Sequence, residues 1–179
     1  MKLYKIYSRA IGLLFALSLL CVGCENEDIL DINDLEISPS NPESVVIVEP
    51  DDGITSVNAL TKAINENGDA TYILRRDGVY YMEGKNVFKH NVVIKAENGS
   101  GKMPIIQPIC DAQGALNADM IRLEGSATFE NIYIIGKDAA TGNLMQRLFR
   151  IDESNVRLKF DNCFIDHCRN FCIRTDNVN

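Results

Sequence analysis

Apolar positions after residue 44 predict many short strands separated by turns. Short apolar runs alternate with turns rich in Gly, Asn, Asp and Lys, a pattern typical of strands. The strands predicted before the central repeat are residues 45–48, 71–74, 78–82, 87–88, 92–94 and 104–107. Residues 110–119 are weakly patterned, and no element is predicted there.

One helix is predicted in the segment that ends at Gly68, where a left-handed residue suits a helix C-terminus. Thr55 or Ser56 can cap its first turn. Its apolar residues share one face and are Val57, Leu60 and Ile64. We expect this helix to cover the first end of a stack of strands, because uncovered strand edges allow end-to-end association.

A four-residue pattern repeats three times between residues 120 and 176. It consists of an apolar residue, an arginine, an apolar residue or threonine, and an acid, at residues 121–124, 149–152 and 173–176. A second block, Phe-acid-Asn followed by a strand signal, occupies residues 129–134 and 160–165. Residues 90–94 are a degenerate copy of this block. Its asparagines, Asn91, Asn131 and Asn162, are spaced by 40 and 31 residues, within the range of solenoid repeats.

These repeats predict an all-β fold, a right-handed parallel β-helix (solenoid) with an N-terminal capping helix, over residues 45–179. Equivalent strands would stack about 4.8 Å apart. Each asparagine would sit at a sharp bend with positive φ, and stacked asparagines can hydrogen-bond to one another. No hairpin signal accompanies them, which argues against a sandwich. The sequence stops in mid-coil at Asn179, so we expect a β-helix truncated at its C-terminus.

Residues 1–23 have the pattern of an export signal. A basic start precedes an apolar core at residues 11–20, shorter than the roughly 20 residues that span a bilayer. Residues 21–24 resemble a bacterial lipobox, although Cys21 stands where leucine is usual. The resemblance implies a lipoprotein signal peptide and a lipid on Cys24, which would anchor the protein. The alternative is a short membrane anchor.

Residues 24–44 read as an acidic tether after the lipid position. Glu25, Glu27 and Asp28 resemble the surface-export signal of lipoproteins in Bacteroidota-type outer membranes. This resemblance implies a protein lipid-anchored in the outer membrane and exposed at the cell surface. The alternative is simply the solvated start of a tether.

Charge limits the partners of the mature chain. After Cys24 there are 15 basic and 25 acidic residues, a formal charge of −10. This excess repels a phosphate backbone, so nucleic acid is not an expected partner. Acidic polysaccharides are repelled on average, but a local row of arginines or bound calcium reverses the sign in one cleft.

The blocks at residues 129–134 and 160–165 resemble the coils of pectate-lyase-like (pectin lyase-like) right-handed β-helix proteins. The whole arrangement is similar to the N-terminal part of uncharacterised β-helix lipoproteins of gut Bacteroidota. That superfamily includes lyases, hydrolases, epimerases, adhesins and scaffolds, so its function is open. The resemblance implies a carbohydrate-associated scaffold or binding module. The alternatives are the N-terminal fragment of a polysaccharide lyase, for which calcium is possible, and an adhesin-like interaction protein.

The arginines of the repeated pattern are the candidate ligand-facing residues. Arg122, Arg150 and Arg174 occupy equivalent positions, so we expect them to stack on one outer face. The acids Glu124, Asp152 and Asp176 follow two residues later on the same face. This row either grips an acidic sugar chain or forms a surface ladder of mutually paired charges.

No residue is predicted to be catalytic and none to bind metal. A cluster in the last complete coil, Asp161, Asp166, His167 and Arg169, is a weaker alternative. Cys163, Cys168 and Cys172 form a C-x4-C-x3-C pattern, whereas zinc sites usually have closer pairs. We expect small core residues here, and the disulfide state of these three and of Cys110 is open.

Overall fold

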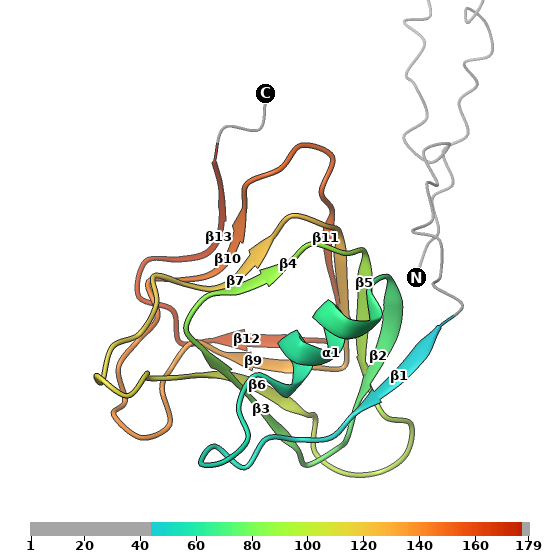
Figure 1. Cartoon of the computed structure of the whole chain (residues 1–179), viewed down its shortest axis with the longest axis horizontal. Helices are drawn as coiled ribbons and strands as arrows, with labels where there is room; N and C mark the ends of the chain where they lie inside the picture. Colours follow the sequence, from blue (N-terminus) through green and yellow to red (C-terminus); the bar gives the residue numbers. More distant parts are fainter. Residues whose placement is uncertain (1–43, 177–179) are drawn as a thin grey trace, which may run out of the picture. The chain divides into compact units, whose positions relative to one another are not determined.

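The structure is a computed structural model in which residues 44–176 are described. The predicted signal peptide, Cys24 and nearly all of the predicted tether lie outside the described residues. Figure 1 shows the arrangement of the elements. In chain order they are β1 (Val45–Val48), α1 (Ala59–Asn67), β2 (Ala70–Leu74), β3 (Val79–Glu83), β4 (Asn86–Phe88), β5 (Val92–Ala96), β6 (Ile105–Ile109), β7 (Asp119–Leu123), β8 (Ala127–Glu130), β9 (Tyr133–Ile135), β10 (Arg147–Ile151), β11 (Leu158–Asp161), β12 (Phe164–Asp166) and β13 (Phe171–Thr175).

The strands form three sheets in which every strand pairing is parallel. The first sheet has the order β1-β2-β5-β8-β11, the second β3-β6-β9-β12 and the third β4-β7-β10-β13. From β2 onward the chain visits the three sheets in a fixed order, so each strand pairs with the strand three places later. The predicted all-β class with parallel strands is confirmed.

Alternate residues of the strands point into a common core, as expected for a pleated strand with one buried face. In the first sheet Ile94 is in register with Phe129, and Phe129 with Phe160. The rings of Phe129 and Phe160 are stacked with centroids 5.6 Å apart. Phe149 of the third sheet meets Phe129 edge-on at 5.4 Å, so side chains of different sheets share one interior.

Helix α1 covers the first end of the strand stack. It contacts β1, β2, β3 and β4, which include the first strand of every sheet, and it lies across the space between the sheets in Figure 1. Leu60 and Ile64, two of the three apolar residues assigned to one face, are 0% exposed. The helix therefore seals apolar surface that strands alone would leave open.

The helix begins later than its sequence predicted. It starts at Ala59, so the expected cap at Thr55 or Ser56 is wrong. The reason is that Asp52 accepts hydrogen bonds from the backbone N–H groups of Thr55 and Ser56, which holds them in a turn. The buried carboxylate of Asp51 accepts from the Ala59 N–H at 3.1 Å and takes the capping role.

Two of the three predicted asparagine bends have positive φ. Asn131 has φ 58° and Asn162 has φ 48°. Their side chains are stacked, with Asn162 Nδ2 donating a hydrogen bond to Asn131 Oδ1 at 2.6 Å. Each residue joins a strand of the first sheet to a strand of the second sheet.

The prediction of a third asparagine bend, at Asn91, is wrong. Asn91 is not among the described residues with positive φ. Strand β5 pairs Val92 with Ala127, so Asn91 is equivalent to Ser126 rather than to Asn131. Its Oδ1 accepts a hydrogen bond from the Ser126 N–H at 3.0 Å. The interval between these equivalent residues is therefore 35 residues (127 minus 92), not 40. At the place that corresponds to Asn131, a longer loop joins β5 to β6 instead of a tight asparagine bend.

The other end of the stack has no comparable cover among residues 44–176. Strands β11, β12 and β13 are each the last strand of their sheet. Phe164 is 62%, Phe171 57% and Ile173 44% exposed. Apolar side chains of the last coil thus face solvent, in contrast to those beneath α1.

Candidate functional site

The arginines of the repeated pattern lie in register on the third sheet. Arg122 of β7 is aligned with Arg150 of β10, and Arg150 with Arg174 of β13. Their neighbours Ile121 and Phe149 are fully buried, so the alternation of a strand directs the arginines outward. Stacking of this row on one face, as its spacing predicts, is therefore present.

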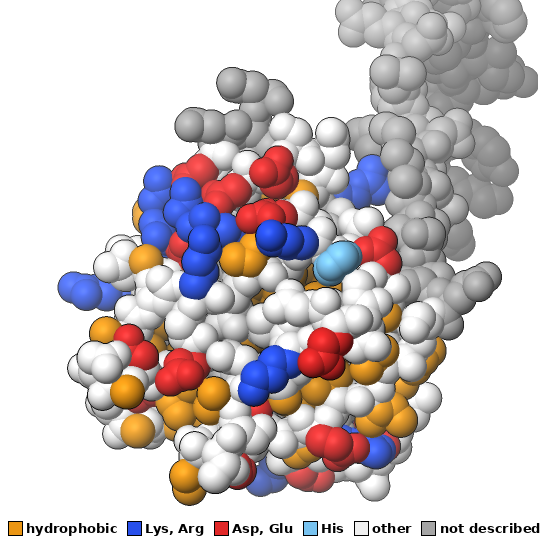
Figure 2. Space-filling model, in the orientation of Figure 1, with side chains coloured by type: hydrophobic (Ala, Val, Ile, Leu, Met, Phe, Trp, Pro, Cys, Tyr) orange, Lys and Arg blue, Asp and Glu red, His pale blue; other side chains and the backbone are white. Residues whose placement is uncertain are grey.

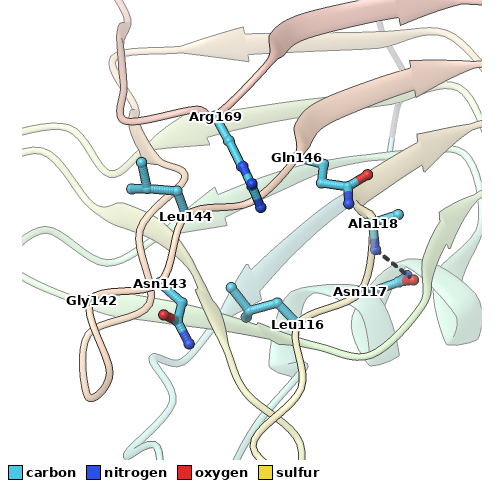
Figure 3. Close-up of a pocket in the computed structure, with 8 residues that line it drawn as sticks. All are labelled: Leu116, Asn117, Ala118, Gly142, Asn143, Leu144, Gln146 and Arg169. Carbon is cyan, nitrogen blue, oxygen red and sulfur yellow. Dashed lines mark hydrogen bonds between the residues drawn. The ribbon is translucent and has the colours of Figure 1, made fainter.

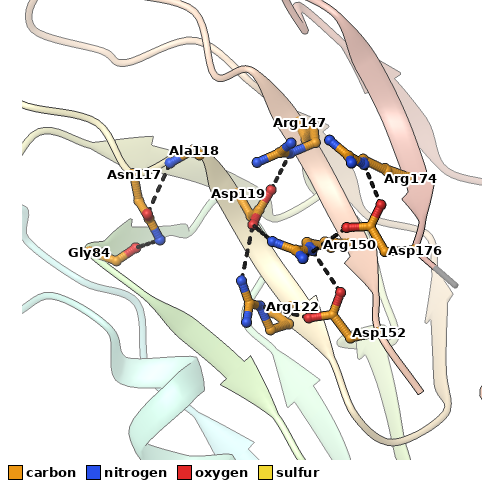
Figure 4. A network of polar contacts seen from close by, with 10 residues as sticks. All are labelled: Gly84, Asn117, Ala118, Asp119, Arg122, Arg147, Arg150, Asp152, Arg174 and Asp176. Carbon is orange, nitrogen blue, oxygen red and sulfur yellow. Dashed lines mark hydrogen bonds and ion pairs between the residues drawn. The ribbon is translucent and has the colours of Figure 1, made fainter.

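These arginines are paired with aspartates rather than free. Arg150 Nε lies 2.6 Å from Asp152 Oδ1, and Arg150 Nη2 lies 2.8 Å from Asp176 Oδ2. Arg122 Nε lies 3.1 Å from Asp152 Oδ2, but its N–H is not aligned for a hydrogen bond, so this contact is an ion pair only. Arg174 Nε donates to Asp176. Figure 4 shows that the contacts run across successive strands.

The sequence analysis did not reveal two members of this network, Asp119 and Arg147. The Asp119 side chain is 6% exposed, and it pairs with Arg147 and approaches Arg122 Nη2 at 3.5 Å and Arg150 Nη1 at 3.6 Å. It lies in the segment where no element was predicted. A usable signal was charge at equivalent positions, since Asp119 and Arg147 each stand three residues before an arginine of the repeat and are aligned.

We call this set the arginine–aspartate ladder, formed by Arg122, Arg147, Arg150, Arg174, Asp119, Asp152 and Asp176. Glu124, expected to belong to it, makes none of these ion pairs among residues 44–176. The ladder has four positive and three negative groups. In Figure 2, basic side chains with acidic ones among them gather over the region where Figure 1 places β7, β10 and β13.

The ladder shifts the titration of its members. Burial disfavours the charged form of Arg150, but the hydrogen bond and charge of Asp152, with Asp176 and Asp119 adding, raise the pKa of its guanidinium overall. The hydrogen bond from Arg174 lowers the pKa of Asp176 against a smaller opposing effect of burial, helped by the charges of Arg174, Arg150 and Arg147. Both groups stay ionised at neutral pH, so the ladder remains a set of paired charges.

A pocket opens beside the ladder, between the segment before β7 and the loop before β10, as Figure 3 shows. Its volume is about 540 Å³. It adjoins the ladder because Ala118 precedes Asp119 and Gln146 precedes Arg147. We call it the loop pocket, lined by Leu116, Asn117, Ala118, Gly142, Asn143, Leu144, Gln146 and Arg169.

Some polar side chains of the loop pocket already make hydrogen bonds within the protein, and others do not. Asn117 is committed to the fold, since its Oδ1 accepts from the Ala118 N–H and its Nδ2 donates to the Gly84 carbonyl. Within residues 44–176, no hydrogen bond or ion pair involves the side chains of Asn143, Gln146 or Arg169. In Figure 3 the Arg169 side chain extends toward Gln146. These groups are available to a ligand.

The cluster considered as an alternative site is only partly assembled. His167 Nδ1 lies 2.8 Å from Asp166 Oδ2. Asp161 and Arg169 make no ion pair with either residue in the described part of the chain. Arg169 instead lines the loop pocket. The four residues are close in sequence but do not converge on one point.

Cys163, Cys168 and Cys172 were expected to be small core residues, and the structure agrees only in part. Cys172 is exposed, while Cys163 and Cys168 are half-buried and pack against the core. The Cys168 and Cys172 Sγ atoms are 2.9 Å apart. Among residues 44–176 no group of three or more His, Cys, Asp or Glu side chains is placed to hold a metal ion.

Comparison with known protein families finds no family model that matches this chain, and comparison with curated proteins finds no match. No helix in the described part of the chain has both the length and the apolar character needed to cross a bilayer. The chemistry of the ladder and of the loop pocket is therefore the basis for a functional assignment.

Proposed function

We propose that this protein is a surface-anchored lipoprotein whose right-handed parallel β-helix acts as a scaffold or binding module for acidic polysaccharide. The observation that carries the binding function is the loop pocket, in which Arg169, Asn143 and Gln146 present unengaged polar groups beside the ladder. Guanidinium and amide groups together match the carboxylates and hydroxyls of a uronate chain.

The β-helix interpretation is supported by the fixed order in which the chain visits three parallel sheets. Parallel strands joined by crossovers in one sheet are nearly always right-handed, which favours that hand for the coils. The stacked Asn131 and Asn162 bends support a regular coil register. A stack of this kind gives a rigid surface on which sugar-binding groups are held in fixed positions.

The proposed binding centre is the loop pocket rather than the row of Arg122, Arg150 and Arg174. A sugar carboxylate approaching the row must compete with Asp152 and Asp176 for the same guanidinium groups. These ion pairs are partly buried, and they occupy the donors that a ligand needs. The row therefore serves the stacking of coils. The ladder as a whole has four arginines and three aspartates, and this excess of one positive charge draws an anion toward Arg169.

The loop pocket also suits a carbohydrate by its size and lining. Its volume of about 540 Å³ lies within the usual range of small-ligand sites. Leu116 and Leu144 provide apolar surface for the face of a sugar ring, and the amides of Asn143 and Gln146 provide both donors and acceptors. Arg169 adds a charge-assisted contact, so an acidic sugar should bind more tightly than a neutral one.

Anchoring at the outer membrane rests on the sequence. The lipobox-like residues 21–24 and the acidic residues after Cys24 support a lipid on that cysteine and display at the cell surface. A tethered module of this kind would hold polysaccharide near the cell. Labelling of intact cells and mass analysis of the N-terminal peptide test this part, with Cys24→Ser as the variant that should lose the lipid.

Titration calorimetry of the full chain with acidic and neutral oligosaccharides of equal length tests the binding function. We expect acidic uronate chains to bind and Arg169→Ala to weaken them at least about 10-fold, since a hydrogen bond to a charged group contributes about 1.5–3 kcal/mol. The matched control is Arg174→Ala, an exposed ladder arginine outside the pocket, with less than about 3-fold change expected. Equal binding by Arg169→Ala and the wild type would refute the assignment.

The polysaccharide lyase and the adhesin remain distinguishable alternatives. A lyase needs a base and carboxylates that hold calcium beside the substrate carboxylate. In the described residues Asp119, Asp152 and Asp176 are taken by arginines, so the ladder does not provide such a site. Release of unsaturated uronate during incubation with calcium would favour the lyase. Binding of neutral glycans or proteins, unaffected by Arg169→Ala, would favour the adhesin.

A further inference from the structure

We propose that Cys168 and Cys172 form a disulfide that ties the loop between β12 and β13 to strand β13. The two Sγ atoms are 2.9 Å apart across a spacing of four residues. Closing this gap to a bond length of about 2.05 Å requires a movement of less than about 1 Å. A displacement of this size is within the reach of small side-chain rotations.

The remaining described cysteines are engaged elsewhere. Cys163 Sγ lies 3.3 Å from the carbonyl oxygens of Phe129 and Asp161, to which its thiol donates. Cys110 Sγ lies 3.7 Å from the Thr141 hydroxyl. Within residues 44–176, Cys168 and Cys172 are the only cysteines in contact with each other. The structure thus selects one pairing from those that the sequence left open.

The position of Cys172 in the coil explains why a crosslink is useful there. In register it is equivalent to Leu148 of β10 and Met120 of β7, which are 0% and 1% exposed. Leu148 is covered in the preceding coil, where a Cβ at Gly136 would meet its Cδ2 at 2.4 Å. The loop before β13 is much shorter than the loop before β10. Cys168 lies in that short loop and contacts Cys172 in β13. A covalent bond between them would take the place of the apolar loop residues that cover Leu148 in the preceding coil.

The oxidant that the bond requires is an external disulfide, either a small molecule or a protein. One cysteine of the pair loses its proton, and its thiolate attacks one sulfur of the external disulfide, forms a mixed disulfide and releases the other sulfur as a thiolate. The second cysteine then loses its proton, attacks the sulfur of the first cysteine and releases the second external thiolate. Both released thiolates become thiols by taking up the two protons. Two cysteine thiols are oxidised, and one external disulfide is reduced to two thiols.

The environment of Cys172 favours its protonated form. The hydrogen bond with Cys168, followed by burial, raises the pKa of Cys172 to about 11. Because the thiolate is the attacking species in exchange, Cys172 must lose its proton before its sulfur can react.

The crosslink would also fix a residue of the loop pocket, because Arg169 lies inside the closed loop. The Arg169 N–H already donates to the Met145 carbonyl at 2.8 Å. A bond between residues 168 and 172 limits the movement of that segment and holds the guanidinium over the pocket. This consequence rests on the proposed function, whereas the crosslink itself does not.

Peptide mapping tests the bond directly. The full chain is incubated with glutathione disulfide, its free thiols are blocked with iodoacetamide, and it is digested with trypsin without reductant. Cleavage after Lys159, Arg169 and Arg174 separates the two cysteines into peptides 160–169 and 170–174. The bond joins these peptides, with a mass two hydrogens below their sum, and reduction separates them.

Single variants resolve the ambiguity that peptide 160–169 also contains Cys163. The linked peptide should persist in Cys163→Ser and Cys110→Ser and vanish in Cys168→Ser. Fragment ions of the wild-type linked peptide locate the bond even where a variant does not fold. Alkylated Cys168 and Cys172 after excess oxidant, or a bond through Cys163, would overturn the proposal.

A second readout keeps the crosslink apart from the binding function. Wild-type chain with the bond intact should bind acidic oligosaccharide several-fold more tightly than the same chain after reduction, and Cys168→Ser should not respond to reductant. Equal affinity in both states, with the linked peptide found, would remove the effect on Arg169 and leave the crosslink standing. Absence of the linked peptide would overturn the crosslink whatever the binding.

Discussion

The two ends of the strand stack handle their apolar surface differently. At the first end α1 contacts β1 to β4, and its Leu60 and Ile64 are 0% exposed. At the other end, in the last coil described, Phe171 is 57% and Ile173 44% exposed. The same kinds of side chain are thus buried at one end and solvated at the other.

Residues in equivalent positions show that the layer, and not the local pattern, decides burial. Ile121, Phe149 and Ile173 are aligned and begin the three copies of the four-residue repeat. Ile121 and Phe149 are fully buried, but Ile173 is not. An apolar position in an inner strand is covered by the paired strands on both sides, whereas a position in the last strand of a sheet has a paired strand on one side only. The comparison predicts that equal substitutions have unequal effects along the stack.

We expect the largest loss of stability when Asp119, the buried aspartate of the ladder, is substituted. Asp119→Asn leaves Arg122, Arg147 and Arg150 without their shared carboxylate, whose side chain is 6% exposed. Removing one partner of a buried pair costs about 3–5 kcal/mol, so we expect the free energy of unfolding to fall by about 4 kcal/mol. Urea unfolding followed by circular dichroism measures it.

The matched control is Asp176→Asn, which removes the corresponding partner in the last coil, where the Arg174 side chain is 45% exposed. Solvent screens this pair, so the loss should be clearly smaller than that of Asp119→Asn. Similar losses for the two variants would show that position in the stack does not set the strength of the ladder.

The same comparison can be made with apolar side chains, one in α1 and one in β13, the last strand. Leu60→Ala removes a fully buried side chain under α1 and should lower the free energy of unfolding by about 3 kcal/mol. Phe171→Ala removes a larger side chain that is mostly solvated and should change it by less than about 1 kcal/mol. The urea midpoints of both variants, measured at equal protein concentration, show which substitution costs more stability. A larger loss for Phe171→Ala would mean that the last coil is covered in solution.

A smaller effect is expected at the stacked asparagines. Asn162→Ala loses the 2.6 Å hydrogen bond to Asn131 and places alanine at positive φ, with a combined loss of about 2 kcal/mol. Asn162→Gly loses only the hydrogen bond, so its loss should be about 1 kcal/mol. At Asn91, which has no positive φ, glycine should be no better than alanine. Thermal unfolding of the four variants tests this contrast.

The smallest effect is the pH dependence of the last ladder pair. The pKa of an aspartate in the unfolded chain is about 3.9. In the folded chain the hydrogen bond from Arg174 lowers the pKa of Asp176 below that value. The stabilisation by Asp176 is therefore present above about pH 4 and is lost as pH falls through the lower, folded pKa. The urea midpoints of wild type and Asp176→Asn should differ at pH 6 and converge at lower pH. A difference independent of pH would contradict the ion pair.

Several features of the candidate site followed from the repeat, and others did not. Periodicity placed Arg122, Arg150 and Arg174 in one column because side chains alternate along a strand. It left Asp119 out, because a single acid in an irregular segment has no periodic signal. The loop pocket was also missed, since it is assembled from three segments far apart in the sequence.

The sequence by itself determined the short parallel strands, the helix ending at Gly68 and the asparagine bends at Asn131 and Asn162, because these depend on local propensity and on an interval that repeats. Tertiary structure alone decided that Asp51 caps the helix, that Asn91 belongs to another register, and that Asp119 neutralises the arginines. The register of Asn91 and the pairing of Asp119 depend on contacts between strands far apart in the sequence, and the cap depends on the turn that brings Asp51 to Ala59. In each case the length of the connecting loops sets which residues meet. Loop length carries no periodic pattern, so only the folded chain could reveal them.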